Sequence, residues 1–535
     1  MSLPTLPGYE LPNSKQMDEA RPALRDFLNR KCLIASLWMV LAAGLVLLVP
    51  WCLVHVVDDG ISGQDFRQLI AWALAAAFCQ AASGAFRYFG ECRITRCALD
   101  AEKQCMTSLF SKSMHSDLRY LPELAQGRAM GQIIFASGSE KHFLETLYTQ
   151  GIPLIITAVG TFAALLTLSW KLLCLSLVLC PLALGLWWWM KNKIRPAARA
   201  EYETQEHLYR HIVDTFRAMI SIRALHQEER FVSNFEATCQ NCLNAMFRLR
   251  QKLAVQGPYF DALQALAIAA VFGAGGYGAL HGEITIGAIL GFQIYLARMF
   301  GIMRSGTGLF GAWQQYIEGR ARASDIIRLP QAQTTAYLKA KSPELLRLEH
   351  VSFAFDTHEV WNDKSMTICE GEYQAILLPS GGGKTTLARC ILGLYPISSG
   401  TIAIPDASAE CIGFVPQENV LFDGTIQDNI LMLNPELSTE KYHEILYICE
   451  LEELANRFEQ DSIGDQGSRL SGGEQRRVML ARSLAGNPKL LIIDQMASEL
   501  EPDLCHRIFS RMHEKFPKLG VLYLGHRMPE WERDK

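Results

Sequence analysis

A glycine-rich stretch in the second half of the chain has the residue types and spacing of a phosphate-binding loop. In "AILLPSGGGKTTLARCILGL", a short apolar run precedes Gly381, Gly382 and Gly383, and a helical pattern opens with Lys384 and Thr385. Glycines let a backbone wrap closely round a phosphate, and a helix start directs free N–H groups at it. Lys384 is placed to reach the β- and γ-phosphates of a nucleotide, and the Thr385 hydroxyl to ligate Mg²⁺.

The loop departs from the usual pattern at its first position, where Leu378 stands in place of a glycine. A leucine is compatible with such a loop if its φ is negative. Taken alone, the match leaves a glycine-rich turn with a coincidental Lys-Thr as the alternative. The rest of the second half therefore has to decide between the two.

A second candidate lies in "LLIIDQMASELE", residues 490–501. Four aliphatic residues run into Asp494, which predicts a buried strand that delivers a carboxylate at its C-terminal end. The next residue, Gln495, is an amide where a hydrolytic site of this shape needs a carboxylate base. An amide hydrogen-bonds water but does not accept its proton, so we expect hydrolysis at such a site to be slow.

The order of motifs in this half resembles the ATP-binding-cassette (ABC) transporter superfamily. The segments that carry the resemblance are the phosphate loop 378–385, "FVPQENVLFDGTIQDNI", "RLSGGEQRRVMLARSLAGNPKLLIID", "LGHR" and, upstream, "VSFAFDTHEV". The resemblance implies ATP and Mg²⁺ as ligands and a P-loop NTPase domain of the α/β class.

Residue roles carry over from the family position by position. The ATP-binding residues so implied are Phe355, which would stack on adenine, Ser380, Gly381, Gly382, Gly383, Lys384, Thr385, Thr386 and Gln417. The implied metal ligands are Thr385, Gln417 and Asp494. Gln495 occupies the position of the general base, and His526 that of the switch histidine. The signature loop, which in the family contacts the ATP of the opposite subunit, is Ser471, Gly472, Gly473 and Glu474.

Three explanations for Gln495 compete. The chain is the degenerate subunit of a heterodimer, or a native ATP-binding protein that works as a switch, or a form in which a glutamate was replaced to trap the ATP-bound state. Degenerate sites tend to lose several elements together, whereas Lys384, Asp494 and His526 are retained here, which favours replacement. Leu378 and Glu501 favour degeneracy, although neither removes a catalytic group.

The first half reads as a membrane domain. Six apolar segments have the roughly 20 residues that a helix needs to cross a bilayer. They lie near 32–57, 68–90, 151–170, 171–190, 258–280 and 286–308. Lys and Arg gather before the first span and in the two long stretches between spans two and three and spans four and five. Both termini are therefore expected in the cytoplasm, with the chain a multi-pass protein of the cytoplasmic (inner) membrane.

These observations predict a chain with two parts: an α-helical membrane domain of the exporter type and, after it, the nucleotide-binding domain. We expect a cytoplasmic segment at 1–31, a transmembrane domain at 32–330, a linker at 331–345 and the nucleotide-binding domain at 346–535. Coupling helices are expected within 92–150 and 191–255. With about 30 residues before the first span, we do not expect a peptidase domain there. Nine residues follow His526, fewer than members of the family commonly have.

Partners follow from the resemblance and from charge. Because the signature loop of one subunit closes the ATP site of the other, the resemblance implies a dimer of two such half-transporters, a homodimer by preference or a heterodimer. The net charge of −4, with 20% charged residues, gives no global basic field, so nucleic acid is not expected as a partner. Membrane lipid and an amphipathic small molecule or peptide are the expected partners.

The expected activity is ATP-driven export, or leaflet flipping, of an amphipathic peptide, lipid or drug, with an ATP-gated channel or regulatory protein as the alternative. Polar residues within spans are candidates for the cargo pathway because they are costly in hydrocarbon. These candidates are Gln80, Arg87, Gln264, Gln293 and Arg298. Asp261 and Arg304 are expected nearer the inner interface, where helix packing or an ion pair is favoured over cargo contact. Arg298 fits cargo contact and helix packing equally, and an anionic or peptidic cargo would suit it.

Overall fold

The chain divides into two compact units. A computed structural model describes residues 30–120, 126–178, 180–332, 336–355, 358–379, 381–459, 461–495 and 500–526. The first unit takes in 1–110 and 129–327, and the second takes in 111–128 and 328–535. A short segment from the first half of the sequence thus belongs to the same unit as the C-terminal half.

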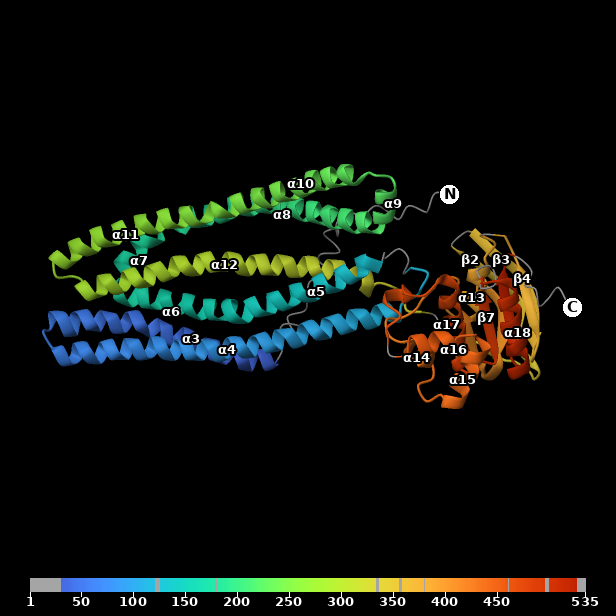
Figure 1. Ribbon diagram of the computed structural model, residues 1–535. Helices are drawn as coiled ribbons and strands as arrows, with labels where there is room; N and C mark the ends of the chain where they lie inside the picture. Colours follow the sequence, from blue (N-terminus) through green and yellow to red (C-terminus); the bar gives the residue numbers. More distant parts are fainter. Residues whose placement is uncertain are drawn as a thin grey trace. The chain divides into compact units, whose positions relative to one another are not determined.

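Long helices make up the first unit (Figure 1). In chain order they are α3 (Arg30–His55), α4 (Phe66–Met114), α5 (Gln126–Thr146), α6 (Ile152–Leu168), α7 (Trp170–Leu177), α8 (Cys180–Arg217), α9 (Met219–Ala224), α10 (Glu228–Ala254), α11 (Gln256–Leu280) and α12 (Ile286–Ile327). Two π-helical turns, η1 (Val56–Ser62) and η2 (Leu147–Gly151), extend α3 and α5.

Helices of this unit are long and apolar enough to cross a membrane, as the sequence predicts. Within the described residues such stretches are Cys32–Ser62, Phe66–Met114, Met130–Leu168, Glu228–Leu280 and Ile286–Ile327. They cover five of the six predicted spans. The other predicted span, 171–190, falls on α7 and the beginning of α8, where residue 179 and several side chains lie outside the described part.

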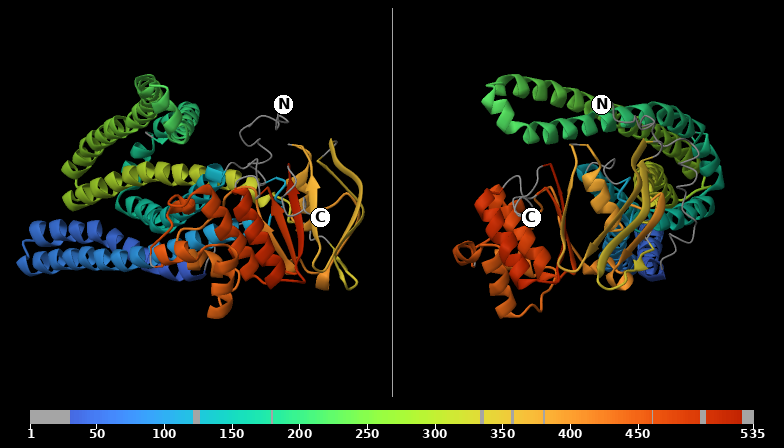
Figure 2. Two further views of the ribbon diagram at one scale, coloured as in Figure 1. Left: turned by 45° about the vertical axis from the view of Figure 1, so that its right-hand side comes forward. Right: turned by 90° about the vertical axis from the view of Figure 1, so that its right-hand side faces the viewer.

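Several helices are longer than a bilayer is thick. The 49 residues of α4 extend over about 74 Å at 1.5 Å per residue, more than twice the roughly 30 Å of a hydrocarbon core. Helices α8 and α10 pack along each other, and α9 lies between them in the chain (Figures 1 and 2). The helices therefore continue beyond the bilayer and turn back, which is the simplest account of the long polar stretches in the sequence.

Apolar side chains and close backbone approach hold the spans together. A buried cluster joins α6, α7, α11 and α12 through residues that include Leu165, Leu172, Phe260 and Phe292. At Gly291 of α12, a Cβ atom would come within 2.2 Å of a methyl group of Val54. Only glycine lets α12 approach the α3–η1 helix this closely, a device common between membrane helices.

The second unit is an α/β domain with two four-stranded sheets. Its strands are β1 (Leu338–Lys339), β2 (Glu344–Phe355), β3 (His358–Cys369), β4 (Tyr373–Leu377), β5 (Ser399–Ile404), β6 (Ile412–Val415), β7 (Leu490–Asp494) and β8 (Gly520–Gly525). Its helices are α13 (Lys384–Ile391), α14 (Ile426–Leu431), α15 (Thr439–Ile448), α16 (Glu452–Arg457), α17 (Gly472–Ala485) and α18 (Pro502–Lys515), with short 3₁₀ turns at Pro405–Ala407, Ala409–Cys411 and Asp465–Gly467.

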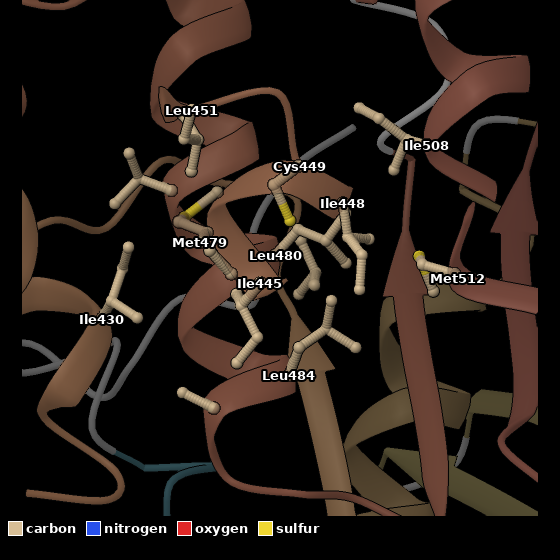
Figure 3. Close-up of a cluster of buried hydrophobic side chains, with 14 of the residues drawn as sticks. Ile430, Ile445, Ile448, Cys449, Leu451, Met479, Leu480, Leu484, Ile508 and Met512 are labelled. Carbon is tan, nitrogen blue, oxygen red and sulfur yellow. The ribbon is translucent and has the colours of Figure 1, made fainter. Parts of the chain in front are cut away.

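The parallel sheet, of order β4-β8-β7-β6, lies between two apolar cores. Leu490 and Ile492 of β7 face the core shared with α13 and the other sheet, whose order is β1-β5-β2-β3. Leu491 and Ile493, which alternate with them, face the core built with α14, α15, α17 and α18 (Figure 3). Both faces of β7 are therefore buried, which explains its unbroken aliphatic run.

The segment after α4 is bonded to the stretch that follows α12. The N–H of Asp117 donates to the carbonyl of Pro330 at 2.9 Å, and the N–H of Ala332 donates to the carbonyl of His115 at 3.0 Å. The side chain of Leu118 packs against the core between the two sheets. This part of the first predicted cytoplasmic stretch is thus held on the second unit by backbone bonds and by an apolar contact.

Candidate nucleotide site

The site lies at the carboxyl edge of the parallel sheet. Because β4, β6, β7 and β8 run parallel, the residues that follow each of them gather at one edge. The phosphate loop follows β4, Gln417 comes two residues after β6, Asp494 ends β7 and His526 follows β8. Four segments far apart in the sequence therefore supply one site.

The phosphate loop needs glycine at two of its positions. Gly381 has φ +79° and Gly383 has φ +82°, both in the left-handed region that side chains disfavour. A Cβ on Gly383 would also come within 2.6 Å of Val360 and 2.7 Å of the Trp361 indole nitrogen. Leu378 has no positive φ, which meets the condition for a leucine at the first position of the loop.

Lys384 is buried and bonded inside the loop. Its ammonium donates to the carbonyls of Leu378 at 2.8 Å and Pro379 at 3.0 Å, and Nδ1 of His526 lies 3.3 Å away. Burial lowers the pKa of Lys384, while the nearby Asp494 carboxylate opposes that change. Phosphate oxygens are stronger partners than carbonyls, so a bound nucleotide would replace neutral acceptors with charged ones.

Asp494 is fully buried and bonded to the helix that follows the phosphate loop. The Thr385 hydroxyl donates to Oδ2 of Asp494 at 2.6 Å, while Oδ1 is buried without a hydrogen-bond partner in the described part of the chain. Burial raises the pKa of the Asp494 carboxyl, and the Thr385 bond and the charge of Lys384 oppose the rise. A hydroxyl beside an unsatisfied buried carboxylate oxygen fits Mg²⁺, a cation that takes oxygen ligands.

Gln495 is held in a left-handed conformation, with φ 62°. Its N–H donates to the carbonyl of Leu524 at 2.8 Å, and its side-chain oxygen accepts from the amide of Gln417 at 3.3 Å. His526, on the neighbouring strand end, has Nδ1 2.9 Å from the carbonyl of Leu378. The residues at the base and switch positions thus lie beside the phosphate loop and the Asp494 strand.

Two residues that were not predicted from the sequence hold the main chain of the site in place. The buried Arg476 of α17 donates to the carbonyls of Gln417 and Gln495, both at 2.9 Å. The buried Trp361 of β3 donates from Nε1 to the carbonyl of Gly383 at 2.9 Å. Both act on main-chain oxygens, so no motif marks them. For Trp361, the sequence offers no more than an indole within a strand of mixed polar and apolar residues.

The signature segment forms the start of α17 instead of joining the phosphate loop. Ser471 caps the helix: its N–H and hydroxyl donate to the Glu474 carboxylate at 2.7 and 2.8 Å. Burial alone would raise the pKa of Glu474, but these bonds lower it on balance. Ser471 and Gly472 are exposed. Between the signature residues and the phosphate loop, the described residues show no hydrogen bond.

Two predicted ATP-binding groups cannot be placed. Ser380 and the side chain of Phe355 lie outside the described residues. Thr386 lies in the first turn of α13 and is half-buried.

The polar residues of the spans are distributed over three helices. Gln80 is exposed on α4, Gln264 is half-buried on α11, and Gln293 and Arg298 are half-buried on α12. Oε1 of Gln293 is buried without a partner within the described ranges. No hydrogen bond or ion pair links these four residues in the part of the chain that the structure describes, so they form no shared polar cluster there.

Asp261 and Arg304, by contrast, form an ion pair. Nη2 of Arg304 lies 2.6 Å from Oδ1 of Asp261, and both side chains are exposed. The expectation of an ion pair at this position is therefore confirmed.

Comparison with known proteins assigns the family. The model of the ABC transporter transmembrane region matches residues 33–303, which is more than half of the chain. The chain belongs to the ABC transporter family. The ABC transporter model for the nucleotide-binding part matches residues 361–498. This ABC transporter is a half-transporter of the exporter type, with one helical transmembrane domain followed by one nucleotide-binding domain.

Relatives and a solved structure agree with that assignment. The transporter is 28% identical over 88% of its length to a multidrug efflux ATP-binding/permease protein of Mycobacterium tuberculosis, of which it spans only 41%. It is 24% identical over 95% of its length to a putative export ATP-binding/permease protein of Rickettsia felis, of which it covers 91%. A bacterial Atm1-family ABC exporter with ATP bound has the same fold, with a TM-score of 0.81, 20% identity and coverage of 94% of this chain and 91% of that one.

Proposed function

We propose that this ABC transporter exports, or flips between leaflets, an amphipathic molecule such as a peptide, lipid or drug, at the expense of ATP. The observation that carries the proposal is the convergence of Lys384, Thr385 and Asp494 at one sheet edge in a chain with a transmembrane domain. The names of relatives support the cargo class, since they include a multidrug efflux protein and an ATP-dependent lipid A-core flippase of Syntrophus aciditrophicus.

The proposed assembly is a dimer in which each signature loop completes the ATP site of the other subunit. Ser471 and Gly472 support this arrangement, because both are exposed at the N-terminus of α17, the end of a helix that attracts an anion. Two copies of this chain are the simplest assembly, and a related half-transporter is the alternative partner. Closure of two nucleotide-binding domains on ATP would then be transmitted to the helices and change which side of the membrane the pathway faces.

Within the ATP site, Lys384 would bind the β- and γ-phosphates, and Thr385, Asp494 and Gln417 would hold Mg²⁺. The metal ion neutralises charge that develops on the transferred phosphoryl group. The chain's own residues position the nucleotide: the loop glycines leave room for the phosphates, and α13 directs its first N–H groups at them.

Gln495 is proposed to make hydrolysis slow. A positioned general base contributes roughly 10²- to 10⁴-fold to a reaction rate, and an amide cannot accept the proton of the attacking water. A glutamate in its place would keep the bond from Gln417, because a carboxylate oxygen accepts the same hydrogen bond. A degenerate subunit of a heterodimer, and an ATP-gated regulatory or channel protein, are the alternative functions that Gln495 leaves open.

The proposed location is the cytoplasmic (inner) membrane, with both termini and the nucleotide-binding domain in the cytoplasm. The distribution of Lys and Arg supports this orientation. Gln80, Gln264, Gln293 and Arg298 are proposed to contribute to the cargo pathway, since each places a polar group within a predicted span.

The test is an ATPase screen on the full chain carrying Gln495→Glu, reconstituted in lipid nanodiscs with a panel of amphipathic peptides, lipids and drugs. We expect this variant to hydrolyse ATP at least 100-fold faster than the parent chain, and one class of compound to stimulate it further. The same chain with Lys384→Ala is the control and should be inactive. Restored ATPase that no compound stimulates would favour a regulatory protein, and a Gln495→Glu chain that stays inert would favour the degenerate subunit.

A further inference from the structure

A proline in the first span leaves a main-chain oxygen without its usual donor. Pro50 lies inside α3, and because proline has no N–H it cannot bond the carbonyl of Val46, four residues earlier. An unsatisfied carbonyl within a membrane span costs several kcal/mol. The donor must therefore come from another helix or from water.

Two side chains of α12 supply donors at this point. Nη1 of Arg298 donates to the carbonyl of Val46 at 2.7 Å. One turn earlier on α12, the hydroxyl of Tyr295 donates to the carbonyl of Leu47 at 2.6 Å. Helix α12 thus bonds two consecutive carbonyls of α3 beside Pro50. These bonds fix the position of the Arg298 guanidinium.

Satisfying a carbonyl does not require a charge, however. Tyr295 bonds Leu47 with a neutral hydroxyl, and an amide or hydroxyl at position 298 could do the same for Val46. Arg298 instead brings a full positive charge and five N–H donors into an apolar helix, and the structure bonds one of these donors. The remaining donors and the charge are not explained by the proline.

The two other arginines within the predicted spans have carboxylate partners. Arg87 bonds Glu91 at 2.8 Å, and Arg304 bonds Asp261 at 2.6 Å. For Arg298, the described ranges contain no carboxylate within ion-pair distance. A charge is costly in hydrocarbon unless it meets an opposite charge. The guanidinium of Arg298 is therefore positioned by protein but not neutralised by it.

Arg298 is also too deep to reach water at the outer surface. It lies twelve residues beyond Ile286, the first residue of α12, which is about 18 Å along the helix and past the middle of a roughly 30 Å hydrocarbon core. Its bond to Val46 directs the side chain sideways onto α3. An anion that meets it at this depth must come with an apolar body, since a bare anion is costly to bring into the hydrocarbon region.

We propose that Arg298 is the subsite that binds the anionic headgroup, a carboxylate or phosphate, of an amphipathic cargo. The planar guanidinium fork matches both groups with two parallel N–H bonds. The inference rests on the proposed function, because it names the chemical class of what the transporter carries. Pro50 and Val46 serve the subsite by holding the guanidinium in place while leaving its other donors available.

The test compares two probes that differ only in charge: dansylated undecanoic acid and its methyl ester. Binding is measured by dansyl fluorescence on the Gln495→Glu chain in phosphatidylcholine nanodiscs. Arg298→Gln keeps an N–H donor for Val46 but removes the charge. Tyr295→Phe is the matched control, because it removes the neighbouring carbonyl bond and leaves the charge.

We expect Arg298→Gln to weaken binding of the acid by roughly 10- to 100-fold, as the loss of a charge-assisted pair does, and to leave binding of the ester unchanged. Tyr295→Phe should change the acid and the ester equally. Equal losses for both probes in Arg298→Gln, or no loss for the acid, would overturn the proposal. Thermal unfolding of both variants shows whether the fold has survived, and Arg298→Lys, which keeps the charge without the fork, should restore part of the acid binding.

A second arm distinguishes the sources of the anion. If phosphatidylglycerol in the nanodisc competes with the acid for the parent chain but not for Arg298→Gln, the headgroup of an anionic lipid occupies the subsite; if it does not compete, the subsite takes free amphiphiles. Failure of the proposed function has a different signature. Acid that binds at Arg298 without stimulating ATPase activity would contradict transport and keep the subsite. Acid that stimulates the Arg298→Gln chain as strongly as it stimulates the chain with Arg298 would keep transport and contradict the subsite.

Discussion

Replacement of Trp361 by phenylalanine should weaken nucleotide binding although the indole contacts no phosphate. Nε1 of Trp361 and the N–H of Leu387 both donate to the carbonyl of Gly383, each at 2.9 Å. Trp361→Phe removes one of the two donors, and the Leu387 bond keeps the carbonyl from being orphaned. The expected loss of stabilisation is therefore the net free-energy contribution of one hydrogen bond, about 1 kcal/mol.

The smaller ring also leaves space in the core between the two sheets, where Trp361 is buried. A conservative change of shape in a core costs up to about 1.5 kcal/mol. Together the two effects amount to about 1–2.5 kcal/mol, which corresponds to a roughly 5- to 60-fold change in an equilibrium. The bonded carbonyl belongs to Gly383, the residue at which the phosphate loop turns into α13. We therefore expect most of this loss to appear as weaker MgATP binding.

The assay is a titration of the full chain with a fluorescent ATP analogue, in parent, Trp361→Phe and Lys364→Met forms. Lys364 lies over the Trp361 ring, with its ammonium 5.4 Å from the ring centroid, so its loss removes a neighbour of the indole without touching Nε1. We expect Lys364→Met to bind as the parent does. Equal affinities for Trp361→Phe and parent, or an equal loss in Lys364→Met, would refute the role assigned to the indole bond.

Three further predictions concern other bonds. Thr385→Val removes the hydroxyl bonded to Asp494. It should weaken ATP binding at least about 10-fold in a titration with Mg²⁺ present, but little in a titration with EDTA. An equal loss of affinity in both titrations would contradict the role of Thr385 as a metal ligand. Asp58→Ala removes the carboxylate that caps the first turn of α12 and should destabilise the chain by about 0.5–2 kcal/mol in thermal unfolding, whereas Asp58→Asn should lose less. The hydrogen bond from Arg507 holds the pKa of Glu450 below its ordinary value of 4.5, so its stabilisation is present above pH 4.5 and lost as the pH falls through the lowered pKa. Glu450→Gln should flatten that acid loss in denaturant titrations, and an unchanged pH profile would contradict it.

The sequence was most informative where function requires special residues at the ends of apolar runs. The phosphate loop, Gln417, Asp494 and His526 each follow a short aliphatic segment, and parallel strands bring such segment ends to one edge. Apolar length likewise predicted the spans, because a helix must cover the hydrocarbon with apolar side chains.

The sequence was uninformative about residues that act through main-chain oxygens. Arg476 stands in a run of charged residues at the start of α17, where a solvated surface arginine is the ordinary expectation. The structure buries it and has it donate to the carbonyls of Gln417 and Gln495. Every residue has a carbonyl, so no pairing of residue types in the sequence announces such a bond.

Arg298 and Arg304 show how the same residue type on one helix separates into two roles once partners are known. Both lie in the last predicted span. From the sequence, their roles could be distinguished only by how far each lies from the ends of that span. The structure gives Arg304 the carboxylate of Asp261, which accounts for its charge. Arg298 instead bonds the carbonyl of Val46. This bond explains why a hydrogen-bond donor is needed at position 298 but does not explain the positive charge. Pro50 creates the demand for that donor, and any donor would meet it. The positive charge of Arg298 is therefore the feature from which we infer an anionic ligand.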